Sequence, residues 1–440
     1  AEASATYNLA SPLWPAAAVV ARTTNDVVAA VHAARQAGLG VRVQSTGHGA
    51  GNQAPLDRTV LVRTVLDAPV RVDPATRTAR VPAGATWADV VSAAEPHGLA
   101  ALHGSSPTVG VIGNLLGGGI SFYGRWFGVA ASYVRSITLV LADGQVVVAS
   151  RENEAGLFWA LRGGGGGFGV VVEMEVELVP MTSVVTGGMF WDASDAAEVA
   201  TLWEAWTTNA AEEATTSLRL MNLPPLPGVP PALTGRQILV LDGAVTVQRP
   251  ADIRRAHRVT DDLLDPLRTA AAPILDTWHV GPPSALTTTH LDPSDPLPYH
   301  GGHALLKPLG STGIDRFLSA AGPGSGTSIV SAELRQLGGA FEVPDRTGGA
   351  FDRTDAAFAY VGLGIAEADG LAATEDDLAR IAAATAPWHT GFTTPTFVEN
   401  RTQPQRTFDD VTAARVAAVR SNVDPDGLFA GSVAPVVDQT

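Results

Sequence analysis

The sequence lacks cysteine altogether and has a single lysine, Lys307, among its 440 residues. Without cysteine the chain has no disulfide, no thiolate nucleophile and no zinc or iron–sulfur site that needs a thiolate ligand. It also lacks a run of about 18 apolar residues, so no membrane-spanning helix is expected. The 29 basic and 44 acidic residues leave a net charge of −15, which disfavours binding to nucleic acid or to an anionic membrane surface.

The first residues, Ala1-Glu2-Ala3-Ser4, do not include a methionine, so we expect a trimmed or processed form. A cytoplasmic location and secretion after removal of a signal both fit this sequence. The composition gives no oligomeric state. The apolar share of 45% over this length allows one large core or two to three ordinary ones.

The first 180 residues alternate between helical and strand patterns. Apolar residues recur at three- and four-residue steps from Thr24 to Gly38, where Thr24 or Asn25 can cap a helix. A second helix is expected over 86–97. Strands are expected over 41–43, 60–65, 78–81, 137–141 and 146–148, the last two joined by an Asp143-Gly144 hairpin turn. The alternation indicates an α/β or α+β fold.

The sequence after Pro180 is richer in proline and predicts a second sheet-plus-helix domain. Loops are expected over 223–231 and 281–298, and Tyr299, His300 and His303 follow the longer of them. Strands are expected over 237–241, 328–337 and 356–365, and helices over 252–267, 375–384 and 408–422.

Three glycine clusters lie in the first part, over 47–51, 110–119 and 163–167. Glycine allows a backbone to approach a ligand closely, so that main-chain amides converge on a diphosphate. None of the clusters has the strand–GxGxxG–helix setting of a Rossmann unit, and no Walker lysine is present. Tight turns in a sheet-rich fold are the alternative to a cofactor site.

The motifs that contain these glycines resemble those of a known family. They are Gln44–His48, Ser106–Gly110 with Leu116–Gly119, Leu157–Gly164 with Phe168–Val171, and Asp424–Phe429. In order and spacing they are similar to the FAD-linked oxidases of the berberine-bridge-enzyme-like branch of the vanillyl-alcohol-oxidase fold. The resemblance implies an α+β, two-domain PCMH-type FAD-binding fold. Its FAD-binding domain would span 1–180, completed by 400–440, and a substrate domain with an antiparallel sheet and helices would span 181–399.

The resemblance also implies residue roles. His48 matches the histidine that bonds covalently to the flavin 8α-methyl, and Ser106 stands where some relatives carry a second, cysteine, attachment. Val109 matches the position that controls oxygen access. The implied cofactor-binding set is Gln44, Ser45, Thr46, Gly47, His48, Gly49, Ser106, Thr108, Val109, Gly110, Gly113, Asn114, Gly118, Gly169 and Val171.

The chain departs from the family where the acid–base residues are expected. The usual tyrosine–x–asparagine reads Phe397-Val398-Glu399, and Ile120 stands where some relatives place a tyrosine. Strand alternation places Glu333, Arg335 and Leu337 on one face, so Glu333 is a candidate base and Arg335 a candidate for orienting a substrate oxygen. Glu399 is a second candidate base. A surface ion pair and a surface carboxylate are the respective alternatives.

The expected function is an FAD-dependent oxidase. It would take hydride from a C–H next to oxygen or nitrogen of a small organic or natural-product substrate, and O₂ would reoxidise it to give H₂O₂. A dehydrogenase with another acceptor, a flavin-dependent tailoring enzyme and a flavin-binding protein that has lost catalysis are the alternatives. No metal is expected, because the spacing of His290, His300 and His303 fits no ligand motif.

Overall fold

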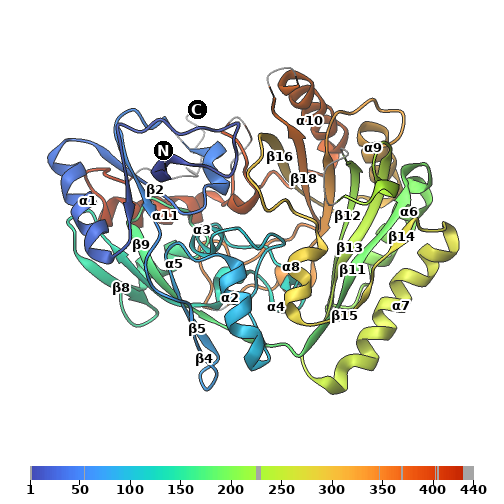
Figure 1. Cartoon of the computed structure of the whole chain (residues 1–440), viewed down its shortest axis with the longest axis horizontal. Coiled ribbons are helices and arrows are strands. Elements are labelled where there is room, and N and C mark those ends of the chain that lie inside the picture. The colour runs from blue at the N-terminus through green and yellow to red at the C-terminus, as the bar shows by residue number, and fades with distance from the viewer. Residues whose placement is uncertain are drawn as a thin grey trace.

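A computed structural model describes residues 2–53, 55–223, 229–345, 347–367, 370–401, 403 and 406–429 of the chain. Two groups of sheets lie side by side (Figure 1). The first group comes from residues before 181 and the second from residues 183–365, so each group is nearly continuous in sequence. None of the helices in the described ranges is long and apolar enough to cross a membrane.

The first group contains a parallel three-stranded sheet and an antiparallel five-stranded sheet. The parallel sheet has the order β1, β3, β2, with bounds Ala17–Ala21, Thr59–Thr64 and Gly40–Gln44. The antiparallel sheet has the order β4, β5, β9, β7, β8, with bounds Arg71–Asp73, Thr78–Pro82, Val170–Glu177, Val134–Val140 and Val146–Ser150. The pairing of β7 with β8 confirms the predicted hairpin.

Helix α1 (Thr24–Gln36) shows how local sequence sets an element. Its cap is Thr23, not Thr24 or Asn25 as predicted, because the Thr23 hydroxyl accepts from the Asp26 amide and the Asp26 carboxylate accepts from the Thr23 amide. The buried stripe is Val27, Ala30, Val31 and Ala34. The second predicted helix is shorter than expected: α2 (Trp87–Ala94) ends in a 3₁₀ turn over Glu95–His97.

The second group is one antiparallel sheet of eight strands. Along the sheet the order is β14, β11, β13, β12, β17, β18, β16, and β15 also pairs with β11. The bounds are Leu275–Asp276, Ser183–Asp192, Gln237–Val247, Ala214–Asn222, Ser331–Gln336, Phe358–Ile365, Tyr299–Leu306 and His279–Gly281. Tyr299, His300 and His303 therefore lie in strand β16, not at the end of a loop as the sequence suggested.

Both faces of this sheet are covered. Helices α6, α7, α9 and α10 pack on one face through apolar side chains such as Trp203, Leu263 and Phe317 (Figure 1); their bounds are Ala196–Thr207, Ile253–Ala270, Gly310–Ala321 and Leu371–Thr385. Leu218, Leu241 and Leu334 of the strands point to these helices. Their neighbours along the strands point the other way, toward the first group, because side chains alternate in a strand.

The C-terminal segment returns to the first group. Helix α11 (Asp410–Val423) places Arg415 over the ring of Trp159, 3.7 Å from its centroid, and Arg420 donates to the Gly166 carbonyl at 3.0 Å. Phe429 then bridges to Val41 of β2. The α+β class with two sheet groups is confirmed, while the exact domain limits at 180 and 399 stay a prediction; residues 430–440 of the proposed completion lie outside the described part.

Candidate flavin site and buried charged array

The turn at His48 begins the candidate site. Gly47 has φ 84°, a left-handed conformation that glycine adopts without strain, and it leads into a 3₁₀ turn over His48–Asn52. The His48 ring stacks on Tyr7, with centroids 3.8 Å apart. Its Nδ1 lies 2.8 Å from Thr46 Oγ1 and its Nε2 lies 3.3 Å from Thr108 Oγ1. Burial lowers the pKa of His48 to about 4, although Asp292 acts in the opposite direction. The imidazole is therefore neutral at pH 7.

The second glycine loop meets the first at this histidine. Ser106 Oγ lies 3.1 Å from Thr108 Oγ1, so hydroxyls link Ser106 through Thr108 to His48. A Cβ on Gly110 would lie 3.0 Å from Ser45 Oγ, which is tighter than an ordinary contact. A side chain at 110 would thus fill the space between the two loops. Val109 is partly buried against the core of the first group.

The loop before Glu399 covers the far end of the second cluster. Thr396 Oγ1 accepts from the Gly119 amide at 3.2 Å and donates to the Gly117 carbonyl at 3.0 Å. Close by, α3 (Val111–Leu116) carries Asn114, whose Oδ1 is buried without a hydrogen-bond partner in the described part of the chain, as is Ser45 Oγ. Buried polar atoms normally have partners. Unpaired oxygens beside glycines that a Cβ would crowd fit a large polar cofactor such as FAD.

Some of the predicted cofactor residues also make contacts within the fold. Gln44 donates from Nε2 to the carbonyls of Ala3 and Ala5 and so anchors the N-terminal segment. Gly169 packs against the Val140 carbonyl, and Val171 pairs with Leu139 inside the five-stranded sheet. The other predicted glycines differ in the space around them. A Cβ added at Gly118 would meet the ring of Phe351. A Cβ added at Gly49 would lie 3.8 Å from Asn52 Nδ2, and one added at Gly113 would have no atom within 4 Å.

Glu399 lies on the Tyr7 side of His48. The Tyr299 hydroxyl contacts the His48 carbonyl at 3.3 Å and also hydrogen-bonds to the Glu399 carboxylate. Residue 399 is partly exposed, but its carboxyl group is enclosed, and a Cβ on Gly301 of β16 would lie 2.9 Å from Glu399 Cγ. Burial raises the pKa of Glu399 to about 7, although the Tyr299 hydrogen bond lowers it. This carboxylate is well matched to proton transfer near neutral pH.

Glu333 and Arg335 belong to a cluster that we call the charged array: Arg219, Asp242, His290, Glu333 and Arg335. Each member is 4% exposed or less. Arg335 Nε donates to Glu333 Oε1 at 2.6 Å, Ser217 Oγ donates to the same oxygen at 2.7 Å, and Arg219 pairs with Asp242. The alternative of a surface ion pair is therefore wrong. Glu333 and Arg335 do lie on one face of β17, as the alternation predicted.

The charged array reaches the second glycine loop through Arg335. Its Nη2 lies 3.5 Å from Ser105 Oγ, next to Ser106 in the chain. The guanidinium stacks 4.8 Å from the centroid of Phe122 in the first group and 5.3 Å from that of Phe397. Burial raises the pKa of Glu333, but the guanidinium groups of Arg335 and Arg219 outweigh burial and hold this pKa well below its usual range. Glu333 is therefore ionised at neutral pH.

Sequence reasoning missed the other half of the array. His290 Nδ1 lies 3.1 Å from both oxygens of Asp242, and Nε2 lies 3.4 Å from Glu333 Oε2. The available signal was Asp242 itself, a carboxylate at the end of the apolar run Ile238–Leu241, where a charge needs a buried partner. The described residues contain no group of three side chains that could hold a metal ion.

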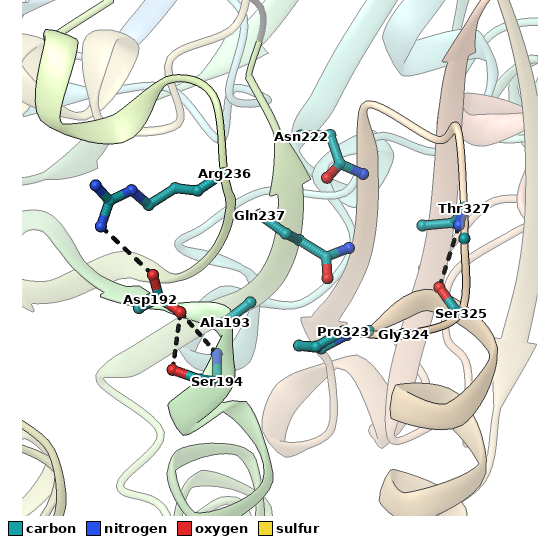
Figure 2. A pocket seen from close by; sticks show the side chains of 12 residues that line it. Asp192, Ala193, Ser194, Asn222, Arg236, Gln237, Pro323, Gly324, Ser325 and Thr327 are labelled. Carbon is teal, nitrogen blue, oxygen red and sulfur yellow. Dashed lines mark hydrogen bonds and ion pairs between the residues drawn. The ribbon is translucent and has the colours of Figure 1, made fainter.

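A separate pocket of about 330 Å³ lies at the ends of the inner strands β11, β13 and β12 of the eight-stranded sheet. Figure 2 shows Asp192 and Arg236 pointing toward each other on one side of it and Gln237 pointing toward the Gly324–Thr327 turn on the other. It contains no predicted site residue, and Asp192 there pairs with Arg236 at 3.5 Å.

Comparison with known proteins agrees with the geometry of the loops. Residues 15–150 match the FAD binding domain family. The chain is 35% identical over 180 residues to (R)-6-hydroxynicotine oxidase of Paenarthrobacter nicotinovorans and 35% identical over 182 residues to glucooligosaccharide oxidase of Sarocladium strictum. These matches cover 41% of this chain in both cases, and 39% and 36% of the two relatives, so the chain matches less than half the length of each.

The structural likeness extends further than the sequence match. The fold superposes on the structure of wild-type BBE-like 1 of Physcomitrella patens with a TM-score of 0.80 and 18% identity, covering 100% of this chain and 95% of the other. At that identity the likeness establishes the fold alone. The FAD-binding domain match therefore covers residues 15–150, and the chain as a whole has the fold of the berberine bridge enzyme-like proteins.

Proposed function

We propose that this protein is an FAD-dependent oxidase that holds its flavin covalently through His48 and oxidises a C–H next to oxygen or nitrogen in a small organic substrate. One observation carries the proposal. The charged face of the eight-stranded sheet contacts the flavin loop at Ser105, through Arg335 Nη2 at 3.5 Å. A cofactor in the loops and a substrate on the sheet would therefore share one site.

Bound FAD supplies an acceptor for hydride. The groups that would hold it are the amides and hydroxyls of the first two glycine loops. Ser45 and Asn114 are polar side chains close to the crowded glycines, and Thr108 lies beside His48. The neutral His48 ring has a free electron pair on one nitrogen, as attachment to the flavin 8α carbon requires. Ser106 lacks the thiol that a second link would need.

The chain offers two carboxylates that can take the proton of a substrate hydroxyl or amine. Glu399, whose pKa is raised to about 7 by burial, becomes a base as the pH rises through 7. Glu333 is ionised throughout the neutral range and lies next to Arg335, which can donate to the substrate oxygen. Correct placement of such a base contributes roughly 10²–10⁴-fold to a rate.

The relatives named above suggest which substrates to try. One is named as an oxidase of 6-hydroxynicotine and another as an oxidase of glucooligosaccharides. A chitooligosaccharide oxidase is also 33% identical over 204 residues. We propose a small molecule with a hydroxyl or amine, and O₂ as the electron acceptor.

The test has two stages. The purified protein is precipitated with acid, and flavin absorbance that stays in the pellet supports covalent attachment. Cellobiose, chitobiose and 6-hydroxynicotine are then added, and flavin bleaching without O₂ and peroxide release with O₂ are measured. Bleaching without peroxide would favour a dehydrogenase with another acceptor. An oxidised product that then rearranges would favour a tailoring enzyme, and no bleaching with any compound would contradict the proposal.

A further inference from the structure

His290 is the one member of the charged array that can change its charge in the neutral range without leaving a carboxylate or an arginine unpaired. It directly follows α8 (Leu286–Thr289) and contacts the array with both ring nitrogens. The charged groups that face it are Asp242 from β13, Arg219 from β12, Glu333 and Arg335 from β17, and Asp292 from its own loop. The ring of Phe122 closes the remaining side, with centroids 5.6 Å apart.

The contacts of His290 determine where its proton lies. Nε2 is 3.0 Å from Arg335 Nη2, and an arginine nitrogen can only donate. Nε2 must therefore accept, which leaves the ring neutral with its proton on Nδ1. That proton points to Asp242, whose two oxygens lie 3.1 Å away. In this state the protonatable atom is Nε2, 3.4 Å from Glu333 Oε2.

The charges of the array are balanced in this state. Two arginines and two carboxylates cancel, and the imidazole is neutral. A proton added to Glu333 would weaken its bonds from Arg335 Nε and Ser217. A proton added to His290 would instead lie between two carboxylates, an arrangement that favours the charged ring. Burial and Arg219 lower the pKa of His290, but the carboxylates outweigh both and raise it above its ordinary value. His290 is therefore the better place for one extra proton.

We propose that His290 stores the proton that substrate oxidation releases. This inference rests on the proposed function. The O–H or N–H bond of the substrate breaks, and its proton passes to Glu333 and on to His290 Nε2. The C–H bond would break with its electron pair leaving as hydride, for which bound FAD would supply the acceptor, and a C=O or C=N product would remain. The proton returns to solvent or to peroxide when O₂ accepts the two electrons. Asp242 positions the ring and balances the imidazolium charge.

Storage of the proton also changes Arg335. A protonated Nε2 can no longer accept from Arg335 Nη2, so this contact breaks while the Nε bond to Glu333 is kept. The freed Nη2 faces Ser105, at the flavin loop. The Arg335 guanidinium contacts His290 and is the proposed donor to the substrate oxygen. Proton storage in His290 would therefore also change how Arg335 binds the oxidised product.

The first test needs no substrate. Protein labelled with ¹⁵N-histidine is titrated by NMR, and the His290 signals are assigned by comparison with His290→Gln among the 10 histidines. We expect the Nδ1–H tautomer at high pH and a cationic ring at low pH, with a midpoint above the ordinary value for a histidine side chain. Asp242→Asn should lower this midpoint. A His290 ring that stays neutral down to pH 5 would overturn the proposal.

The second test uses whichever of cellobiose, chitobiose and 6-hydroxynicotine bleaches the wild-type flavin. His290→Gln keeps a hydrogen-bonding side chain but cannot carry the proton, so flavin reduction should slow at least about tenfold. The wild-type rate should fall at low pH, where His290 is already protonated, and this fall should disappear in His290→Gln. His279→Gln, an exposed histidine on β15, is the matched control and should behave as wild type.

The outcomes separate this inference from the proposed function. If none of the compounds bleaches the wild-type flavin, the proposed function fails and this inference fails with it. If wild type is bleached and His290→Gln has the same rate and pH profile, only the inference is wrong. Should His290→Gln not fold, Asp242→Asn serves in its place; it should slow reduction and shift the low-pH fall to lower pH, and an unchanged profile would contradict the storage role.

Discussion

The two sides of the proposed site use opposite chemistry. The loop side has glycines, hydroxyls and the neutral ring of His48, and the sheet side has four buried charged groups with the ring of His290 among them. Only the loop side falls within the FAD-binding domain match, which ends at residue 150. Neutral amides suit a cofactor that is bound once and kept. Paired charges that can exchange a proton suit a substrate that comes and goes.

The largest effect should come from removing the attachment point on the loop side. We predict that His48→Ala loses all covalent flavin, because the chain has no cysteine for a second link. Flavin can still bind through the loops, with slower reduction, because a covalent imidazole link raises its potential. Acid precipitation followed by absorbance of the pellet measures the link. His279→Ala is the control, and flavin that stays with His48→Ala after denaturation would refute this assignment.

The next largest effect should show whether Glu333 or Glu399 is the base. We predict that Glu333→Gln or Glu399→Gln slows anaerobic flavin reduction at least about tenfold, with the covalent flavin kept. The pKa of Glu399 is raised to about 7, so a Glu399 base is active above that pH, and the reduction rate should rise as the pH increases through 7. The pKa of Glu333 lies far below, so titration of Glu333 itself gives no such rise, and a rise that comes from His290 would be lost in His290→Gln.

The variants distinguish these two carboxylates directly. A rise through pH 7 that is lost in Glu399→Gln but kept in Glu333→Gln assigns the base to the His48 side. Gly301→Ala is a useful companion, because its Cβ would press on Glu399 Cγ without removing the carboxylate. If both glutamine variants reduce flavin at the wild-type rate, the base lies near Tyr299 and His303 or the substrate needs none.

A smaller effect is expected at Val109, the position that the family resemblance assigns to the control of oxygen access. Val109 is partly buried beside His48's partner Thr108. We predict that Val109→Leu slows flavin reoxidation by O₂ several-fold while reduction by substrate stays nearly unchanged, because the added methylene fills space beside the flavin. Stopped-flow mixing of reduced enzyme with O₂ checks this, and Val109→Ala should not slow the step. Equal reoxidation rates for valine and leucine would exclude the role.

The first group of sheets could be predicted from its sequence, and the second only in part. Helix α1 and the β7–β8 hairpin have one buried face, so periodicity locates them. Strands β11 and β12 were missed because both of their faces are buried, by helices on one side and by the first group on the other. Alternation disappears in such strands, and a continuous apolar run does not distinguish strand from helix.

The residues of the candidate site could also be predicted only in part. His48 and Thr108 follow from motifs that keep their spacing, and the structure brings both together. Glu333 and Arg335 follow from alternation alone. The partnership of His290 with Asp242 joins residues 48 positions apart through the sheet order, which no local pattern reveals. The pairing of buried charged residues that are far apart in the chain could therefore not be predicted from the sequence.

The smallest effect concerns whether the loop glycines serve packing or the cofactor. Gly118 has φ 101°, and a Cβ there would lie 2.5 Å from Phe351 Cδ1, whereas Gly98 has φ 68° with no atom within 4 Å. Both alanine variants carry backbone strain of roughly 1–2 kcal/mol, but only Gly118→Ala adds overpacking, typically about 1–3 kcal/mol. We therefore predict that Gly118→Ala lowers the free energy of unfolding more than Gly98→Ala does, as measured by reversible urea unfolding. Covalent flavin content should stay near wild type in both variants, because the Gly118 contact is with Phe351, a side chain of the protein core. Equal unfolding energies combined with lost flavin in Gly118→Ala would instead show that this glycine faces the cofactor.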